Sequence, residues 1–175
     1  SADTSLTVAD FGASEKTFQL LPQVAGRGGR GDSPGRVIIQ TFNPGSYVLK
    51  RVQDHDYAAF YEEEIALRKG LTYPPFSRMV NVRLSCGEQD QGREGVKALG
   101  RRARELVGAN GGPPAVEVIG PAEAPLARIR GRYRWQLLLK GRDSQALHAF
   151  VHDLIAPPLP AGIEALADVD PMNFM

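Results

Sequence analysis

The sequence predicts a chain in two parts, an α/β part followed by an α+β part, and three observations support this fold class. Residues 36–42 are mostly apolar and β-branched, which is typical of a strand buried within a sheet. Tyr73-Pro74-Pro75-Phe76 then forms a stiff boundary that stops a helix. Beyond it, the pattern runs in the order strand, helix, strand, strand, helix, strand. This order is the signature of a ferredoxin-like βαββαβ domain.

The elements of the second part follow from their periodicity. Alternating apolar and polar residues predict strands, and apolar residues at helical spacing predict helices. We expect strands over 79–85, 116–119, 133–140 and 163–169, and helices over 92–109 and 144–155. Ser144 is placed to cap the last helix.

The first part begins with a helix. Ser14 is the expected N-cap, and Pro22 predicts a kink or a restart because proline has no N–H for the carbonyl one turn back. After a turn-rich stretch over 26–35 and the strand over 36–42, the chain is expected to be helical again over 47–69. A break near Gln53 divides this region into two helices.

Two local signals refine the second of these helices. Asp54 or Asp56 can cap it, and Glu64 stands at a favourable i,i+4 spacing from Arg68. The run Glu62-Glu63-Glu64 is expected to be a solvated helix face.

Composition indicates a globular chain in a reducing setting. The 175 residues are 42% hydrophobic and 23% charged, with a formal net charge of +1. Cys86 is the only cysteine, which excludes an intrachain disulfide and a cysteine-built zinc site. No apolar run is long enough for a membrane span, and no signal peptide is visible. We therefore expect a cytoplasmic protein with no membrane partner, and we interpret the chain, which lacks a starting Met, as an excised fragment.

The stretch from Gln23 to Gly31 carries the strongest chemical signal. It contains a glutamine followed by two Gly-Arg pairs, Gly26-Arg27 and Gly29-Arg30. Guanidiniums offer forked, permanently charged donors, and glycines let the backbone approach a ligand closely, so the arrangement suits phosphate. The alternative is a Gly/Arg-rich turn with solvated side chains.

The chain resembles the primosomal protein N′ (PriA) family of replication-restart DNA helicases. The resemblance lies in the run from Asp10 to Gly31, in 34–41 and in His55-Asp56-Tyr57. It continues through 73–76, Gly131-Arg-Tyr-Arg-Trp-Gln-Leu-Leu-Leu-Lys140 and Asp168-Val-Asp-Pro171, and so covers essentially the whole chain in order.

This resemblance implies a fragment of a 3′→5′ DNA-unwinding ATPase that acts at abandoned forks. Residues 1–50 would end the second RecA-like lobe, 51–76 would form a helical connector, and 77–175 would form the family's C-terminal domain. The fragment would leave out the upstream lobe and the family's zinc region, so zinc is expected only in the parent.

The resemblance also assigns roles in an ATP site. Carried over by position, Gln23, Arg27 and Arg30 face ATP, with Gly26 and Gly29 in the same motif, and the missing upstream lobe would complete the site for ATP and Mg²⁺. We expect this chain alone to hydrolyse no ATP. Pro22 and Gly28 depart from the family's usual residues, which leaves open a fork-binding primosome protein that has lost ATPase activity.

A second candidate site lies on the strand over 133–140 and the residues before it. Alternation places Arg132, Arg134 and Gln136 on one face and Tyr133 and Trp135 on the other. A row of arginines can serve a phosphate backbone or a carboxylate. Through the resemblance, Arg132 and Gln136 match positions for the acidic tail of the single-stranded-DNA-binding protein. Branched DNA and other primosome proteins are the further implied partners.

Other residues with reactive or aromatic side chains are expected to have structural roles only. Trp135 is expected to be core, and Asp168 and Asp170 are expected to cap structure or pair with arginines rather than catalyse. His148 and His152 share a helix face but lack a third metal ligand, so no metal site is expected.

Two other functions compete with the helicase fragment. Arg30-Gly31-Asp32 matches a cell-adhesion tripeptide, but the lone cysteine and the longer arginine motif argue against it. The other is a stand-alone nucleic-acid-binding module built on the ferredoxin-like domain, and the fold alone does not support it.

Overall fold

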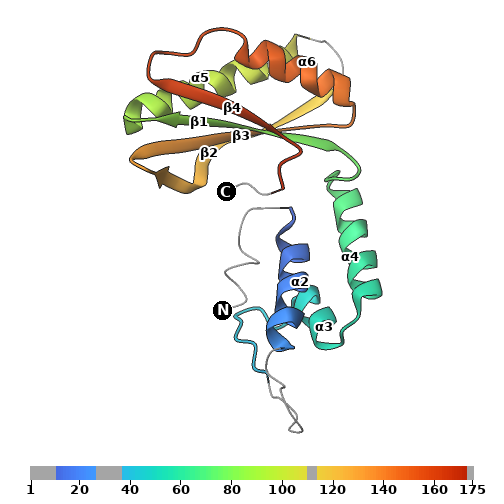
Figure 1. Cartoon of the computed structure of the whole chain (residues 1–175). Coiled ribbons are helices and arrows are strands. Elements are labelled where there is room, and N and C mark those ends of the chain that lie inside the picture. The colour runs from blue at the N-terminus through green and yellow to red at the C-terminus, as the bar shows by residue number, and fades with distance from the viewer. Residues whose placement is uncertain (1–10, 27–36, 110–113, 173–175) are drawn as a thin grey trace. The chain divides into compact units, whose positions relative to one another are not determined.

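The chain divides into two compact units, Ser1–Leu71 and Thr72–Met175, each with its own hydrophobic core. The structure, a computed structural model, describes residues 11–26, 37–109 and 114–172 (Figure 1).

The regular secondary structure described in the first unit is helical. Its helices are α2 (Ala13–Ala25), α3 (Tyr47–Gln53) and α4 (Tyr57–Gly70). The predicted break between the second and third is confirmed. Asp56 caps α4 by accepting a hydrogen bond of 3.0 Å from the Ala59 N–H, as one of the two predicted caps.

Helix α2 differs from its prediction at both ends. Gly12, not Ser14, is the N-cap residue, and it makes no side-chain cap. The helix also runs through Pro22 to Ala25. Pro22 lies in the last turn, where its missing N–H deprives only the Phe18 carbonyl of a helical partner, so the cost stays local.

Aromatic side chains form the core of the first unit. Phe18 of α2 stacks on Phe60 of α4 with ring centroids 4.3 Å apart. Val48 and Val52 of α3 complete the buried cluster. The three helices therefore share one small core rather than three separate contacts.

The strand predicted over 36–42 is wrong for the residues that the structure describes. Residues 37–41 have no regular secondary structure and pair with no strand of the described chain. Ile38 is 81% exposed and Phe42 is 93% exposed. The apolar, β-branched composition favours a strand only where a neighbouring strand supplies the backbone partners.

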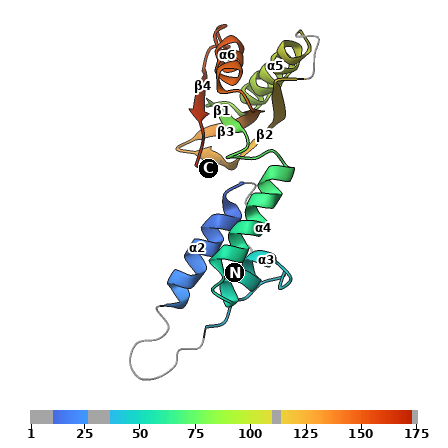
Figure 2. The same cartoon turned by 90° about the vertical axis from the view of Figure 1, so that its right-hand side faces the viewer.

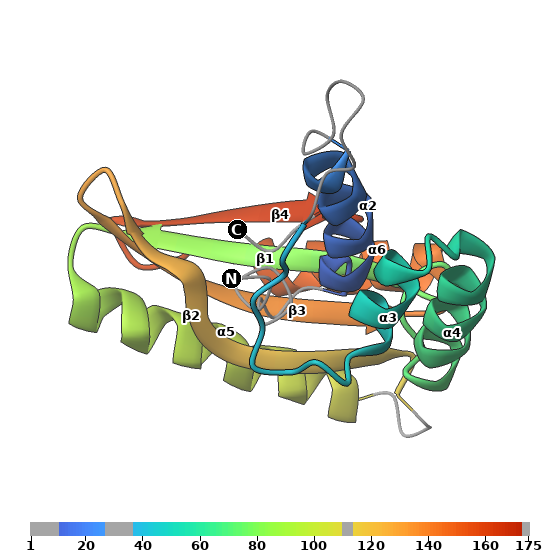
Figure 3. The ribbon, with the colours of Figure 1, turned by 90° about the horizontal axis from the view of Figure 1, so that it is seen from below.

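The second unit contains the predicted four-stranded antiparallel sheet. Its strands are β1 (Arg78–Cys86), β2 (Val116–Ile129), β3 (Arg132–Gly141) and β4 (Ile163–Val169). They lie in the order β2-β3-β1-β4, which is visible from below in Figure 3. With the two helices this is the ferredoxin-like arrangement that the element order predicts.

Two helices cover one face of this sheet. They are α5 (Gln89–Gly108) and α6 (Ser144–Ile155), and Figures 1 and 2 show both on the same side of the strands. The buried core includes Val80, Val82 and Leu84 of β1, Trp135, Leu137 and Leu139 of β3, Val96 and Leu99 of α5, and Leu147 and Leu154 of α6. The alternate positions of β1 and β3 consequently face away from the helices.

Two details of the second unit correct the predictions. Strand β2 extends to Ile129 instead of ending near residue 119, because it continues through register shifts at Ile119/Ala122 and Glu123/Arg128. Gly120 and Pro121 lie at the first shift. The N-cap of α6 is Asp143, which accepts from the Ala146 N–H at 2.8 Å, in place of Ser144.

Candidate functional site

The structure brings two residues of the glutamine–arginine motif to the end of α2. Gln23 is exposed in the last turn, and Gly26 ends the helix by donating its N–H to the Pro22 carbonyl at 2.8 Å. Arg27, Gly29 and Arg30 lie outside the described residues. The assignment of this motif to nucleotide phosphate therefore stays a prediction.

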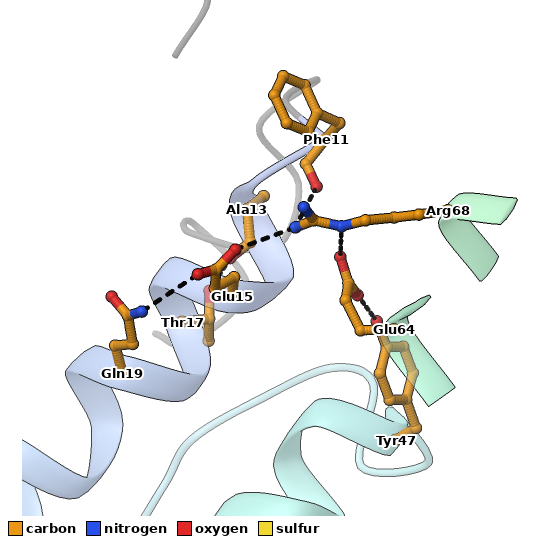
Figure 4. A network of polar contacts seen from close by, with 8 residues as sticks. All are labelled: Phe11, Ala13, Glu15, Thr17, Gln19, Tyr47, Glu64 and Arg68. Atoms are coloured by element: carbon orange, nitrogen blue, oxygen red, sulfur yellow. Dashed lines mark hydrogen bonds and ion pairs between the residues drawn. The ribbon is translucent and has the colours of Figure 1, made fainter. Parts of the chain in front are cut away.

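A polar network fixes the other end of the same helix. Arg68 of α4 donates to the Glu64 carboxylate at 2.7 Å, to Glu15 of α2 at 3.1 Å and to the Phe11 carbonyl at 3.4 Å (Figure 4). The Arg68 guanidinium also lies 5.6 Å from the centre of the Phe11 ring. One side chain thus ties the start of α2 to α4.

Tyr47 extends this network to α3. Its hydroxyl donates to the Glu64 carboxylate (Figure 4). Burial, followed by this hydrogen bond to Glu64, raises the pKa of Tyr47 to about 12. Glu64 is only 9% exposed, so the prediction that 62–64 is a solvated face is wrong at this residue. Its carboxylate is satisfied by Arg68, at the predicted i,i+4 spacing, and by Tyr47, which lies 17 residues earlier in α3.

The polar face of β3 is the second candidate site, and it has the predicted orientation. Trp135 is 3% exposed and belongs to the core, as expected. Arg132, Arg134 and Gln136 occupy the alternate positions, on the sheet face away from α5 and α6. Gln136 is only 8% exposed, so it presents less surface to a partner than the arginines do.

Arg132 is held in place by neighbouring strands. It donates to the Ser85 hydroxyl at 3.3 Å and to the Ser85 carbonyl at 3.1 Å. Its guanidinium also lies 3.1 Å from the Glu164 carboxylate of β4. The Arg132 side chain remains 39% exposed, so it is oriented but accessible.

Ser85 and Glu164, the two partners of Arg132, line a hollow of about 510 Å³. Arg83, Ser85, Arg134, Glu164 and Leu166 are among its lining residues. Within the described residues, Nη1 of Arg134 is buried without a hydrogen-bond partner. The hollow therefore combines guanidinium groups with an apolar side chain, which suits a small anionic group attached to an apolar one.

Several residues of this site were not among the residues predicted from the sequence. Arg83 and Ser85 of β1 and Glu164 of β4 contribute to it. The alternation over 79–85 was the one sequence signal for Arg83 and Ser85, and Glu164 joins them through strand pairing. Asp168 and Asp170 pair with Arg83 and Arg78, each at 3.0 Å, as expected of structural carboxylates.

No group of three or more His, Cys, Asp or Glu residues within the described ranges is arranged to hold a metal ion, and His148 and His152 are both exposed. None of the helices in these ranges is long and apolar enough to cross a membrane.

Comparison with known proteins finds one family. The model of the primosomal protein N C-terminal domain matches residues 69–172. The replication restart protein PriA of Bacillus subtilis is 39% identical over 155 residues, which are 89% of this chain and 19% of that protein. PriA of Synechocystis is 36% identical over 99% of this chain and 20% of its own length, and PriA of Treponema pallidum is 36% identical over 99% of this chain and 26% of its own. The chain thus spans about a fifth to a quarter of these relatives.

Proposed function

This chain belongs to the primosomal protein N (PriA) family, and on that premise we propose that it serves replication restart as a module that binds forked DNA and partner proteins. The observation that carries the proposal is the row of guanidiniums on the sheet face away from the helices. Arg132 and Arg134 stand there beside a hollow, and two strands orient Arg132. DNA and other primosome proteins are the partners that this role requires, in the cytoplasm where the bacterial chromosome lies.

The partner at the hollow is the acidic, carboxylate-ended tail of the single-stranded-DNA-binding protein. A guanidinium binds a carboxylate through two parallel hydrogen bonds, and Arg134 has unused donor capacity among the described residues. Leu166, which is 60% exposed, offers an apolar wall for the side chain next to that carboxylate. Glu164 occupies Arg132 in the free chain, so the tail carboxylate would compete with it.

Calorimetric titration with a synthetic tail peptide tests this site. Arg132→Ala is expected to weaken binding at least tenfold, since a charge-assisted pair is lost. Arg101→Ala is the matched control: Arg101 is an exposed arginine of α5, which covers the other face of the sheet. Unchanged affinity for the Arg132 variant, or equal losses for both variants, would refute the site.

The first unit would contribute to ATP-dependent 3′→5′ unwinding. In this proposal residues 1–50 end the second RecA-like lobe, 51–76 connect it, and 77–175 form the C-terminal domain. Gln23, Arg27 and Arg30 face an ATP–Mg²⁺ complex that an upstream lobe holds, where an arginine stabilises charge on the transferred phosphoryl group. The placement of Gln23 at an exposed helix end is compatible with this role.

A fork-binding protein without ATPase activity is the second candidate, because Pro22 stands in the motif helix. A measurement of ATP hydrolysis by the full-length protein that carries this chain distinguishes the helicase from the fork-binding protein. An Arg30→Ala variant is expected to lose DNA-stimulated hydrolysis if the arginine acts at the phosphate. A full-length protein with no hydrolysis to lose would favour the second candidate.

A further inference from the structure

The tip of the β2–β3 hairpin is a compact structure of its own. Arg128 pairs with Tyr133, and Ile129 pairs with Arg132, in the antiparallel ladder. Arg130 and Gly131 close it with φ values of 49° and 80°, the positive values that two-residue hairpin turns require. The register shift between Glu123 and Arg128 separates this tip from the rest of the sheet. Figure 3 shows that β2 as a whole is bent.

Positive charge at the tip is not neutralised by the described chain. From Ala124 to Arg142 the sequence contains no acidic residue. Arg132 pairs with Glu164, and Lys140 pairs with Glu117 at 2.8 Å. No ion pair with a described carboxylate is found for Arg128 or Arg130, and both are exposed. Two guanidiniums are thus available to an anion from outside.

Apolar and aromatic groups accompany the charges on both faces of the tip. The Arg128 guanidinium lies over the Tyr133 ring, 4.9 Å from its centre, and Arg128 is exposed. Cross-strand partners share a face, so Ile129, 39% exposed, lies beside Arg132 on the other side. Leu126, 48% exposed, comes from the adjoining bulge.

We propose that this tip, residues 126–133, binds single-stranded DNA, with Arg128 and Arg130 on phosphates and the Arg128–Tyr133 pair and Ile129 against bases. Arginine interleaved with aromatic and apolar side chains fits a backbone of phosphates that carries stackable bases. An acidic peptide would use the guanidiniums, but it has no bases to stack on the Arg128–Tyr133 pair. This proposal rests on the proposed function in one respect, which is the choice of DNA as the nucleic acid.

Fluorescence anisotropy with a labelled single-stranded oligonucleotide, measured on the whole chain at several salt concentrations, tests the tip. The double variant Arg128→Gln/Arg130→Gln is expected to bind at least tenfold more weakly. The slope of log K against log salt should fall by about 1.4, since each lost phosphate contact removes about 0.7. Ile129→Ser should weaken binding with an unchanged slope, because an apolar contact releases no counterion. A thermal melt checks that the exposed substitutions leave the fold intact.

Arg101→Gln/Arg104→Gln removes the same charge from exposed positions of α5 and is the control. An equal loss of DNA affinity in both double variants would show that binding depends only on overall charge, and it would overturn the assignment of the tip as the DNA site. Absence of DNA binding by the unmodified chain, or normal binding by the hairpin variant, would also overturn it. The last measurement is binding of the tail peptide to the same hairpin variant. A hairpin variant that loses the peptide but keeps DNA would make the tip a peptide contact, whereas failure of the Arg132 site alone would leave the tip standing.

Discussion

The guanidinium of Arg68 lies 3.1 Å from the carboxylate of Glu15, a residue 53 positions earlier in the chain. Glu15 stands in the first turn of α2, and the last turn of the same helix contains Gln23, with Gly26 as its C-cap. A single arginine of α4 therefore anchors the helix that carries the start of the glutamine–arginine motif. The anchor also satisfies Glu64, which is largely buried.

Removal of this anchor should destabilise the first unit. Arg68→Ala leaves the Glu64 carboxylate buried without its cation, which we expect to cost about 3 kcal/mol of unfolding free energy. Urea unfolding followed by circular dichroism measures the loss. Trp135, the only tryptophan, reports the second unit separately by fluorescence.

Arg51→Ala is the control for this prediction, since its pair with Glu63 is more exposed than the pair of Arg68 with Glu64. The control should change the unfolding midpoint far less. A Trp135 midpoint that moves with Arg68→Ala, or a circular-dichroism midpoint that does not move, contradicts the assignment of the network to the first unit.

The pKa of Tyr47, raised to about 12, predicts a pH dependence. The folded state holds the phenolic proton more tightly than the unfolded state, whose pKa is about 10. The resulting stabilisation is complete below pH 10 and is lost as the pH rises toward 12. Tyr47→Phe should remove the latest step from a tyrosinate absorbance titration. Should that step persist in the variant, it belongs to another tyrosine.

Gly92 is predicted to be a packing requirement of the second unit. A Cβ at this position would lie 2.0 Å from Cζ3 of Trp135, so Gly92→Ala must displace the indole or helix α5. We expect a loss of about 2–3 kcal/mol and a shift of the tryptophan emission to longer wavelength. Gly108→Ala in the same helix, where a Cβ meets nothing within 4 Å, is the control and should not destabilise the unit. An unchanged melting temperature for Gly92→Ala would mean that α5 and β3 pack differently.

Glu164 is predicted to restrain the tail-binding site. Glu164→Gln removes the carboxylate that pairs with Arg132 in the free chain, so a peptide carboxylate no longer has to displace it. Calorimetry should show binding of the tail peptide several times tighter than to the unmodified chain. Weaker binding would show that Glu164 positions Arg132 instead of competing for it.

The isolated chain is predicted to hydrolyse no ATP. Arginines that face a phosphate cannot hold the nucleotide and its metal ion by themselves. A phosphate-release assay with and without DNA measures this directly. DNA-dependent turnover by the 175-residue chain would show that the site needs no upstream lobe.

Sequence alone predicted the elements whose signals are local. Strand β4 has the predicted bounds because its apolar residues alternate and Gly162 precedes it. The core position of Trp135 followed in the same way from alternation along β3. The face of a strand that a side chain occupies follows from alternation with the two or three residues next to it, so it can be predicted from the sequence.

Features that depend on distant partners were not predictable. The pair of Glu64 with Arg68 was predicted from i,i+4 spacing, but the contact with Tyr47, which accompanies the burial of Glu64, comes from another helix. The strand expected over 36–42 lacked a neighbour among the described residues. At the site, Arg132 and Arg134 were found from their spacing, whereas Ser85 and Glu164 join them only through strand register.

The most direct test of the central claim is a nuclear magnetic resonance titration that observes arginine side-chain N–H groups while the acidic tail peptide is added. The account predicts that the Nε–H signals of Arg132 and Arg134 shift together and saturate at the affinity found by calorimetry. Signals of Arg51 and Arg68, in the first unit, should stay in place. Saturable peptide binding that leaves the Arg132 and Arg134 signals unmoved would contradict the account.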